Sequence, residues 1–140
     1  MLKLEDIMTE INTKLQSFGI EINENDVQEG FSRPSFFVKF DQVYRTQYKD
    51  SFLREIMVLL YYFPNSRYKY QLEIMEMQQN IEEILKDGLA VKDRHIHISD
   101  DIESEVVDGV LQMSFDLEFY DKTDEGEVPG PLMEELYFNE

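Results

Sequence analysis

The sequence contains no cysteine and no tryptophan, and it has only six glycines and four prolines in 140 residues. The absence of cysteine excludes disulfide bonds, thiolate zinc sites and a cysteine nucleophile. The longest apolar run, IMVLLYYF at residues 56–63, is the length of a strand and well short of the roughly 20 residues that cross a bilayer. Because the N-terminus, MLKLEDIMTE, turns acidic within six residues, we expect no secretory signal, no membrane partner and synthesis in the cytosol.

Positive charge is also scarce, since 13 lysines and arginines face 30 aspartates and glutamates, for a net charge of −17. The imbalance is concentrated in residues 99–140, which carry 14 acidic side chains and a single basic one, Lys122. Such a field repels nucleic acid and acidic membranes. It is consistent either with a need for solubility or with a surface that faces DNA without binding it.

Hydrophobic periodicity predicts two helices and several strands. An amphipathic helix is expected over 4–18 and ends at Gly19, and a second over 66–87 is capped by Asn65 or Ser66 and closed by Gly88. Strands are expected at 20–22, 35–43, 52–63, 89–92 and 94–98. Residues 44–51 are interpreted as a long polar loop or as extended strand ends.

The stretch EVVDGVLQMSFDLEFYD at 105–121 predicts a hairpin. Asp108-Gly109 favours a type I′ turn, and counting outward from it places Val107 opposite Val110 and Val106 opposite Leu111. Continuing the count pairs 104 with 113, 102 with 115, 105 with 112 and 103 with 114. Strict alternation then gives the second strand one apolar and one acidic face.

These elements predict an α+β fold, an antiparallel or mixed β-sheet with two α-helices packed on one face. Strand 52–63 has apolar residues on both of its faces, so the face without helices needs a cover. A neighbouring subunit or the chain's own loops could supply it.

The chain divides into a domain at 1–120 and an acidic, extended C-terminal arm at 121–140. Gly126, Pro129, Gly130 and Pro131 interrupt regular structure, and PLMEELYF at 131–138 then offers one or two helical turns. A helix this short does not persist alone. The arm therefore frays, or it docks on its own domain, another subunit or a partner through its apolar residues, Leu132, Met133, Leu136, Tyr137 and Phe138.

No motif indicates catalysis, so we expect no enzyme, no catalytic residue, no cofactor and no metal. His95 and His97 share a strand face near Asp93, but a solvent-facing pair is the simpler interpretation. The acidic run DDIESE at 100–105 lacks the glycine and glutamate spacing of a calcium loop. No nucleophile elbow, P-loop or dinucleotide fingerprint is present.

Basic and tyrosine residues gather around the first hairpin. They resemble a nucleic-acid patch, but the surrounding acidic charge favours an acidic partner that docks on the hairpin tip. The residues expected to bind it are Arg45, Tyr48 and Lys49.

The order of segments resembles a known family. An N-terminal amphipathic helix precedes EGFSRPSFFVKF, a long strand ending YYFP, a helix ending EEILKDG and the hairpin VVDGVLQMSFDLEF. This combination, over roughly residues 4–120, resembles the phage tail terminator proteins of Firmicutes prophages and tailed phages, mostly with contractile tails. The resemblance implies a hexameric ring that caps the tail tube, stops its polymerisation and offers a docking face for the head.

The implied location is the tail or neck of the virion. The implied partners are other copies of the chain, the tail tube protein, the head–tail connector protein and, in contractile tails, the sheath protein. DNA would pass through the ring without specific binding, along an acidic wall assigned to Asp100, Asp101, Glu103, Glu105, Asp116 and Glu118, although these residues could instead lie on the outer rim. The alternatives are another neck or head-completion connector, and an acidic inhibitor that mimics DNA.

Overall fold

The computed structural model describes residues 2–23, 33–66, 68–98 and 101–123. Its helices are α1 (Leu4–Gln16) and α2 (Gln71–Leu85). Its strands are β1 (Glu21–Asn23), β2 (Ser35–Gln47), β3 (Ser51–Phe63), β4 (Leu89–Val91), β5 (Arg94–Ile96), β6 (Glu103–Val107) and β7 (Val110–Lys122). Among these residues, no helix is long and apolar enough to cross a membrane.

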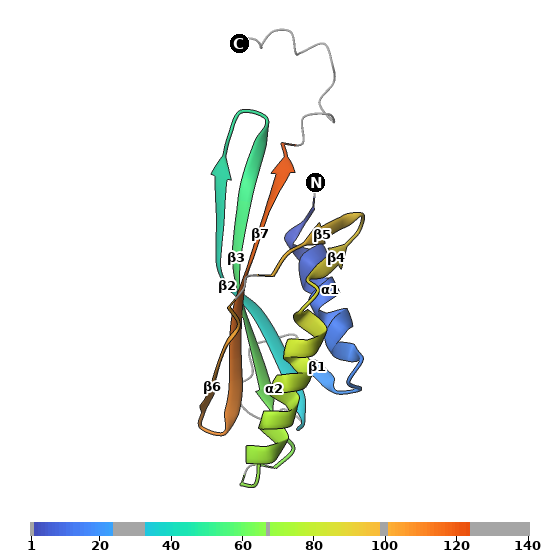
Figure 1. Cartoon of the computed structure of the whole chain (residues 1–140), viewed down its shortest axis with the longest axis vertical. Coiled ribbons are helices and arrows are strands. Elements are labelled where there is room, and N and C mark those ends of the chain that lie inside the picture. Colours follow the sequence, from blue (N-terminus) through green and yellow to red (C-terminus); the bar gives the residue numbers. More distant parts are fainter. Residues whose placement is uncertain (1, 24–32, 67, 99–100, 124–140) are drawn as a thin grey trace.

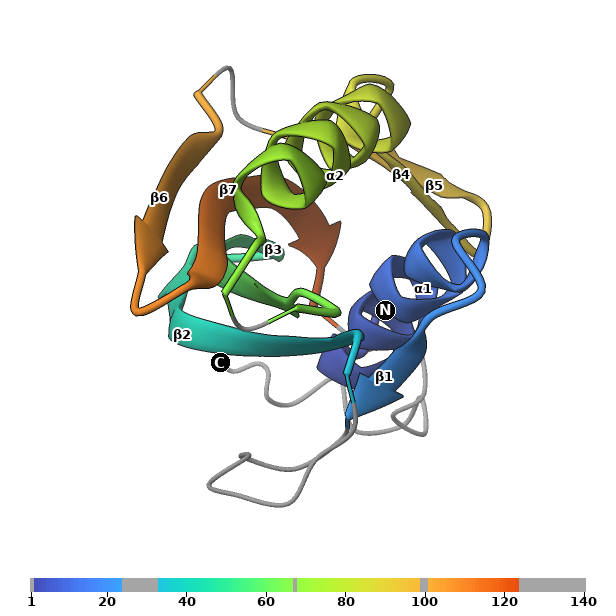
Figure 2. The same ribbon diagram turned by 90° about the horizontal axis from the view of Figure 1, so that it is seen from below.

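The strands form a five-stranded sheet in the order β1-β2-β3-β7-β6 and a separate pair, β4-β5. The sheet is mixed, because β1 runs parallel to β2 while the other neighbours are antiparallel. Both helices and the β4–β5 pair lie on one side of the sheet, which curves around them (Figures 1 and 2). The predicted α+β class, with two helices on one face, is confirmed.

The core lies between that side of the sheet and the helices. Alternate residues of β3, including Ile56, Val58 and Leu60, are buried, as the period of two requires. The helices cover them with stripes of apolar residues, namely Ile7, Ile11 and Leu15 from α1 and Ile74, Met77, Ile81 and Leu85 from α2. Strand 52–63 was therefore correctly assigned as a strand.

The second helix begins later than the sequence suggested. Ser66 does not cap it; its hydroxyl accepts hydrogen bonds from the backbone N–H groups of Tyr68 and Lys69 and closes a separate turn. The helix starts at Gln71, after Tyr70. In its first turn the Glu73 carboxylate accepts hydrogen bonds from the Tyr62 hydroxyl, at 2.6 Å, and from the Asn65 N–H, at 2.7 Å.

The β2–β3 hairpin is long, because the strands continue through most of the polar stretch 44–51 and turn only at 48–50. It therefore extends beyond the helices, beside the end of β7 (Figure 1). A β-bulge between Phe40 and Gln42 leaves Asp41 without a cross-strand partner. Beyond the bulge, Val43 and Arg45 lie on the helix-bearing side and Gln42 and Tyr44 on the other.

The β6–β7 hairpin has the predicted register. Asp108 and Gly109 both have positive φ, 55° and 77°, and the pairs from Val107–Val110 to Glu103–Ser114 match the sequence count. The ladder ends there, so Ile102 lies outside it and packs at the edge of the core. Val106 lies opposite the buried Leu111, on the side of the sheet that faces the core, yet it is 48% exposed.

The far end of β7 is tied to the rest of the domain by Asp121. Its carboxylate accepts a hydrogen bond from the Leu2 N–H at 2.8 Å and forms an ion pair with Arg94 at 3.1 Å. Burial alone would raise the pKa of Asp121, but hydrogen bonds from the Leu2 and Lys122 backbones and the charge of Arg94 outweigh it and lower the pKa.

Candidate functional site

The face of the five-stranded sheet turned away from the helices is the candidate functional surface, and we call it the open face. It is built from the residues of each strand that alternate with the core positions. Neither α1 nor α2 covers it (Figures 1 and 2). Its character changes across the sheet, from apolar on β2 and β3 to acidic on β7 and β6.

The apolar half carries large side chains that are only partly covered by the described residues. Phe37 stacks on Tyr61 with ring centroids 5.9 Å apart, and the Arg33 guanidinium lies 5.9 Å from the centre of the Phe63 ring. Leu59 and Met57 continue this strip along β3, each neither buried nor fully exposed. The sequence indicated this second apolar face, and the structure confirms that the helices do not cover it.

The acidic half brings together four of the six predicted carboxylates. Glu103 and Glu105 of β6 pair with Ser114 and Gln112 of β7, and all four lie on the open face. Asp116 and Glu118 continue the row along β7, and all four acidic side chains are exposed. Asp101 is exposed beside β6 but outside any strand, and Asp100 lies outside the described residues.

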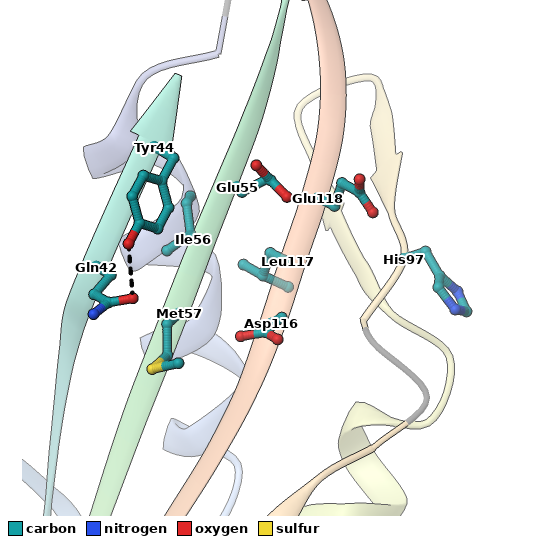
Figure 3. A pocket seen from close by; sticks show the side chains of 9 residues that line it. All are labelled: Gln42, Tyr44, Glu55, Ile56, Met57, His97, Asp116, Leu117 and Glu118. Atoms are coloured by element: carbon teal, nitrogen blue, oxygen red, sulfur yellow. Dashed lines mark hydrogen bonds between the residues drawn. The ribbon is translucent and has the colours of Figure 1, made fainter. Parts of the chain in front are cut away.

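A shallow hollow of about 400 Å³ lies where the acidic row meets β3 (Figure 3). The carboxylates of Glu55, Asp116 and Glu118 line it, and the Tyr44 hydroxyl at its edge donates to Gln42 Oε1 at 3.2 Å. The sequence analysis missed Glu55, because it is the one acidic residue of a strand with apolar residues on both of its faces. Only the pairing of β3 with β7 could have placed it opposite Glu118.

The hollow offers carboxylates but no arrangement that points to catalysis. His97 reaches it only from the segment after β5, at the far side of β7 in Figure 3. Throughout the described ranges, no three His, Asp or Glu side chains are grouped so as to hold a metal ion. His95 and His97 are both exposed to solvent, as predicted.

The predicted hairpin-tip residues are partly engaged by their own chain. The Arg45 guanidinium lies 4.0 Å from the centre of the buried Phe52 ring and donates to Gln47, and Tyr48 packs against Tyr120 with ring centroids 6.4 Å apart. Lys49, at the turn, is exposed. All three residues are nevertheless exposed.

Arg45 also lies directly opposite Arg54 on β3. Burial, and after it the positive charge of Arg45, lower the pKa of Arg54. The two guanidinium groups cover Phe52 on the helix-bearing side of the hairpin, so they are remote from the acidic row on the other side. The predicted arm residues, Leu132, Met133, Leu136, Tyr137 and Phe138, lie outside the described residues.

Comparison with known proteins identifies the family to which the chain belongs. A family model described as phage tail terminator protein matches residues 6–129, which is most of the chain. The chain belongs to the phage tail terminator family. A search of curated proteins finds no match.

Membership of the terminator family settles the general role. Tail terminators are structural proteins of the virion tail and not enzymes, and they act with other tail components. The expected resemblance to the tail terminator family is thereby confirmed, whereas the Firmicutes origin and the contractile tail stay predictions. The match runs beyond residue 120, where the sequence suggested a domain boundary, and that boundary stays a prediction.

Proposed function

We propose that this tail terminator closes the tail tube as a ring of six copies. The ring stops tube polymerisation, presents the surface to which the head–tail connector protein docks and, in a contractile tail of a Firmicutes phage, also touches the last ring of sheath protein. The observation that carries this proposal is the open face, which combines a partly uncovered apolar half with an acidic half on one sheet.

The apolar half supports assembly from identical copies. Burying apolar surface stabilises by about 25 cal/mol per Å², so the strip around Tyr61 and Leu59 favours a partner that removes it from water. A hollow of about 260 Å³ in this half, lined by Phe37, Tyr61 and Phe63 among others, offers a neighbour a place to insert a side chain. Head-to-tail contacts of this kind close into a ring when the rotation permits.

The acidic half supports the second part of the proposal, that DNA passes along it. When the neighbouring copy covers the apolar side chains of β2 and β3, the carboxylates on β7 and β6 and the adjoining Glu55 are left facing the channel. Carboxylates repel phosphates and release no counterions to them, so DNA slides past without being held. The residues that would form this wall are Asp100, Asp101, Glu103, Glu105, Asp116 and Glu118, together with Glu55.

The hairpin tip is proposed to contact the tail tube protein. It extends beyond the helices, and Lys49 and Tyr48 would meet an acidic surface there. Arg45 contributes indirectly, since its contact with Phe52 stiffens the strand end.

Capping is tested by adding purified, labelled terminator to polymerised tube protein and locating the label by electron microscopy. We expect label at one end of each tube, growth arrested at that end, and six copies per end by mass. Label along the tube, or unhindered growth at both ends, would contradict the proposal. Lys49→Glu should weaken end binding, whereas Lys86→Glu, at the end of α2, should not.

The acidic wall is tested separately, in phage carrying Glu103→Lys, Glu105→Lys, Asp116→Lys and Glu118→Lys together. We expect normal particles that eject DNA more slowly. A matched control reverses four exposed acids on or just after the helices, Glu5, Glu76, Glu83 and Asp87. Ejection at the wild-type rate in the first variant would refute the wall but leave the cap intact.

A further inference from the structure

A second apolar surface lies on the other side of the molecule, where the start of α2 meets β6. It is a groove of about 800 Å³, lined by Tyr68, Lys69, Leu72, Met75, Gln78 and Val106, among others. Tyr68 is 88% exposed, Leu72 79% and Met75 52%. These side chains lie away from the helix stripe that faces the core, so folding of the domain does not explain them.

The groove also differs in charge from the rest of this acidic protein. Lys69 is the one charged side chain among its described lining residues, and no described carboxylate lines it. The groove therefore suits an occupant that is apolar and also carries negative charge, which most of this protein's own surface would repel.

The C-terminal arm has that chemistry. Residues 124–140 carry six carboxylate side chains and no lysine or arginine. Their apolar residues fall together in PLMEELYF, where Leu132 and Leu136 are spaced so as to share one face of a short helix. A short helix of this kind becomes stable when its apolar face is buried in a groove.

Chain length favours a neighbouring copy as the source of the arm. The groove lies beside Val106, which pairs with Leu111 near the start of β7, whereas the arm leaves from the other end of that strand. Twelve strand residues separate the two points, or about 40 Å at ~3.3 Å per residue. Leu132 is nine residues beyond Thr123, so it reaches at most about 32 Å even when fully extended. In the helical form that docks, the four residues from Leu132 to Leu136 add only about 6 Å at ~1.5 Å per residue, so Leu136 reaches about 38 Å. The helical apolar block thus falls just short of its own groove.

We propose that the arm of one copy docks in the α2–β6 groove of the next copy, with Leu132, Leu136 and Tyr137 packing on Leu72, Met75 and Val106. This inference rests on the proposed ring and specifies how its subunits are linked. The arm then acts as a strap between neighbours, separate from the contact made by the apolar half of the open face.

Because the chain has no cysteine, single thiols provide a direct test. Full-length Leu136→Cys is activated as a mixed disulfide with thionitrobenzoate and added to full-length Met75→Cys, alone and with polymerised tube protein. The Met75→Cys thiol attacks the activated sulfur, the new disulfide joins the two chains, and thionitrobenzoate leaves. Only unlike chains can join in this design, so the product runs at twice the 16.7 kDa monomer mass.

The matched control is Glu83→Cys, an exposed position near the other end of α2. We expect joining to Met75→Cys to be at least tenfold faster than to Glu83→Cys, and Leu72→Gln in the Met75→Cys chain to remove most of the difference. Equal rates would overturn the proposal. A chain carrying both Met75→Cys and Leu136→Cys that closes on itself at high dilution would also overturn it, since the arm would then dock on its own groove.

A third outcome concerns a different occupant. If tube protein shields Met75→Cys from alkylation and no disulfide forms with Leu136→Cys, the groove binds the tube and the strap is refuted. Tube-end binding of each variant separates this inference from the proposed function. Capping without cross-linking refutes the strap alone, and cross-linking without capping refutes the terminator mechanism alone.

Discussion

Glu55 of β3 and Glu118 of β7 lie directly opposite each other in the centre of the sheet, both exposed on the open face. No basic side chain of the described residues forms an ion pair with either. Like charges at opposed positions destabilise a sheet, so the domain tolerates a local cost at this point. A surface selected only for stability would not keep the pair.

Glu118→Gln is therefore expected to stabilise the domain by about 0.2–1 kcal/mol, because it removes this repulsion. Urea unfolding at low ionic strength measures the change. Glu103→Gln is the matched control, since Glu103 lies opposite the neutral Ser114 and should change stability little. Equal effects of the two substitutions would show that the general negative charge, and not this pair, is responsible.

Asp121→Asn should destabilise the protein at neutral pH by about 1.5–3 kcal/mol, the range for hydrogen bonds to a charged group. The Asp121 side chain is only 9% exposed and holds both Leu2 and Arg94. Because folding lowers the pKa of Asp121, its contribution is complete above the ordinary pKa of 3.8 and disappears as pH falls through the lowered value.

The stability difference between wild type and Asp121→Asn should accordingly be large at pH 7 and small near pH 2. Chemical unfolding at these two pH values avoids the isoelectric region near pH 4.3, where a net charge near zero promotes association. A difference that does not change with pH would mean that Asp121 acts through packing and not through its charge.

Gly88→Ala and Gly19→Ala form a matched pair, since each glycine follows a helix with positive φ, +82° and +72°. Both alanines incur the roughly 1 kcal/mol cost of a left-handed conformation. At Gly88 the new Cβ would also lie 2.5 Å from the Ile96 carbonyl oxygen, whereas nothing lies within 4 Å at Gly19. Thermal unfolding should show a clearly larger loss for Gly88→Ala, and similar losses would contradict the close packing of β5 on this turn.

Arg45→Ala is expected to destabilise the long hairpin by about 1 kcal/mol, because it removes the cation–π contact with Phe52. Relief of repulsion with Arg54 offsets part of that loss. Lys49→Ala, at the exposed turn, serves as the control and should leave stability unchanged. Hydrogen exchange of the β2 and β3 amides near the turn would show whether the loss is confined to the hairpin.

Local signals in the sequence predicted those parts of the fold whose cause is local. Asp108-Gly109 determined both the turn and the register of β6 with β7, because the turn chemistry and the alternation agreed. The predicted start of α2 was wrong. Ser66 is a residue type that favours helix caps, but in the structure Ser66 closes an independent turn. The exposure of Val106 depends on where the start of α2 lies relative to β6, which no alternation pattern reveals.

The candidate surface was predictable only in part, because it too depends on which elements lie side by side in space. The acidic row on β7 is visible as alternation, whereas Glu55 joins it only through the pairing of β3 with β7. Leu72 and Met75 stand out in the sequence as apolar residues outside the helix stripe, but only the position of Val106 beside them makes a groove. The roles of the carboxylate wall, the hairpin tip and the arm stay predictions.

The unpaired Asp41 decides which way the outer half of the first hairpin is turned. If Asp41 paired with Met57 in a regular ladder, every later side chain of β2 would exchange sides. Arg45 would then lie opposite Leu53 on the open face, close to Glu55, and Tyr44 would lie opposite Arg54 on the helix-bearing side. The bulge thus keeps Arg45 on the surface opposite to that of Glu55 and Glu118.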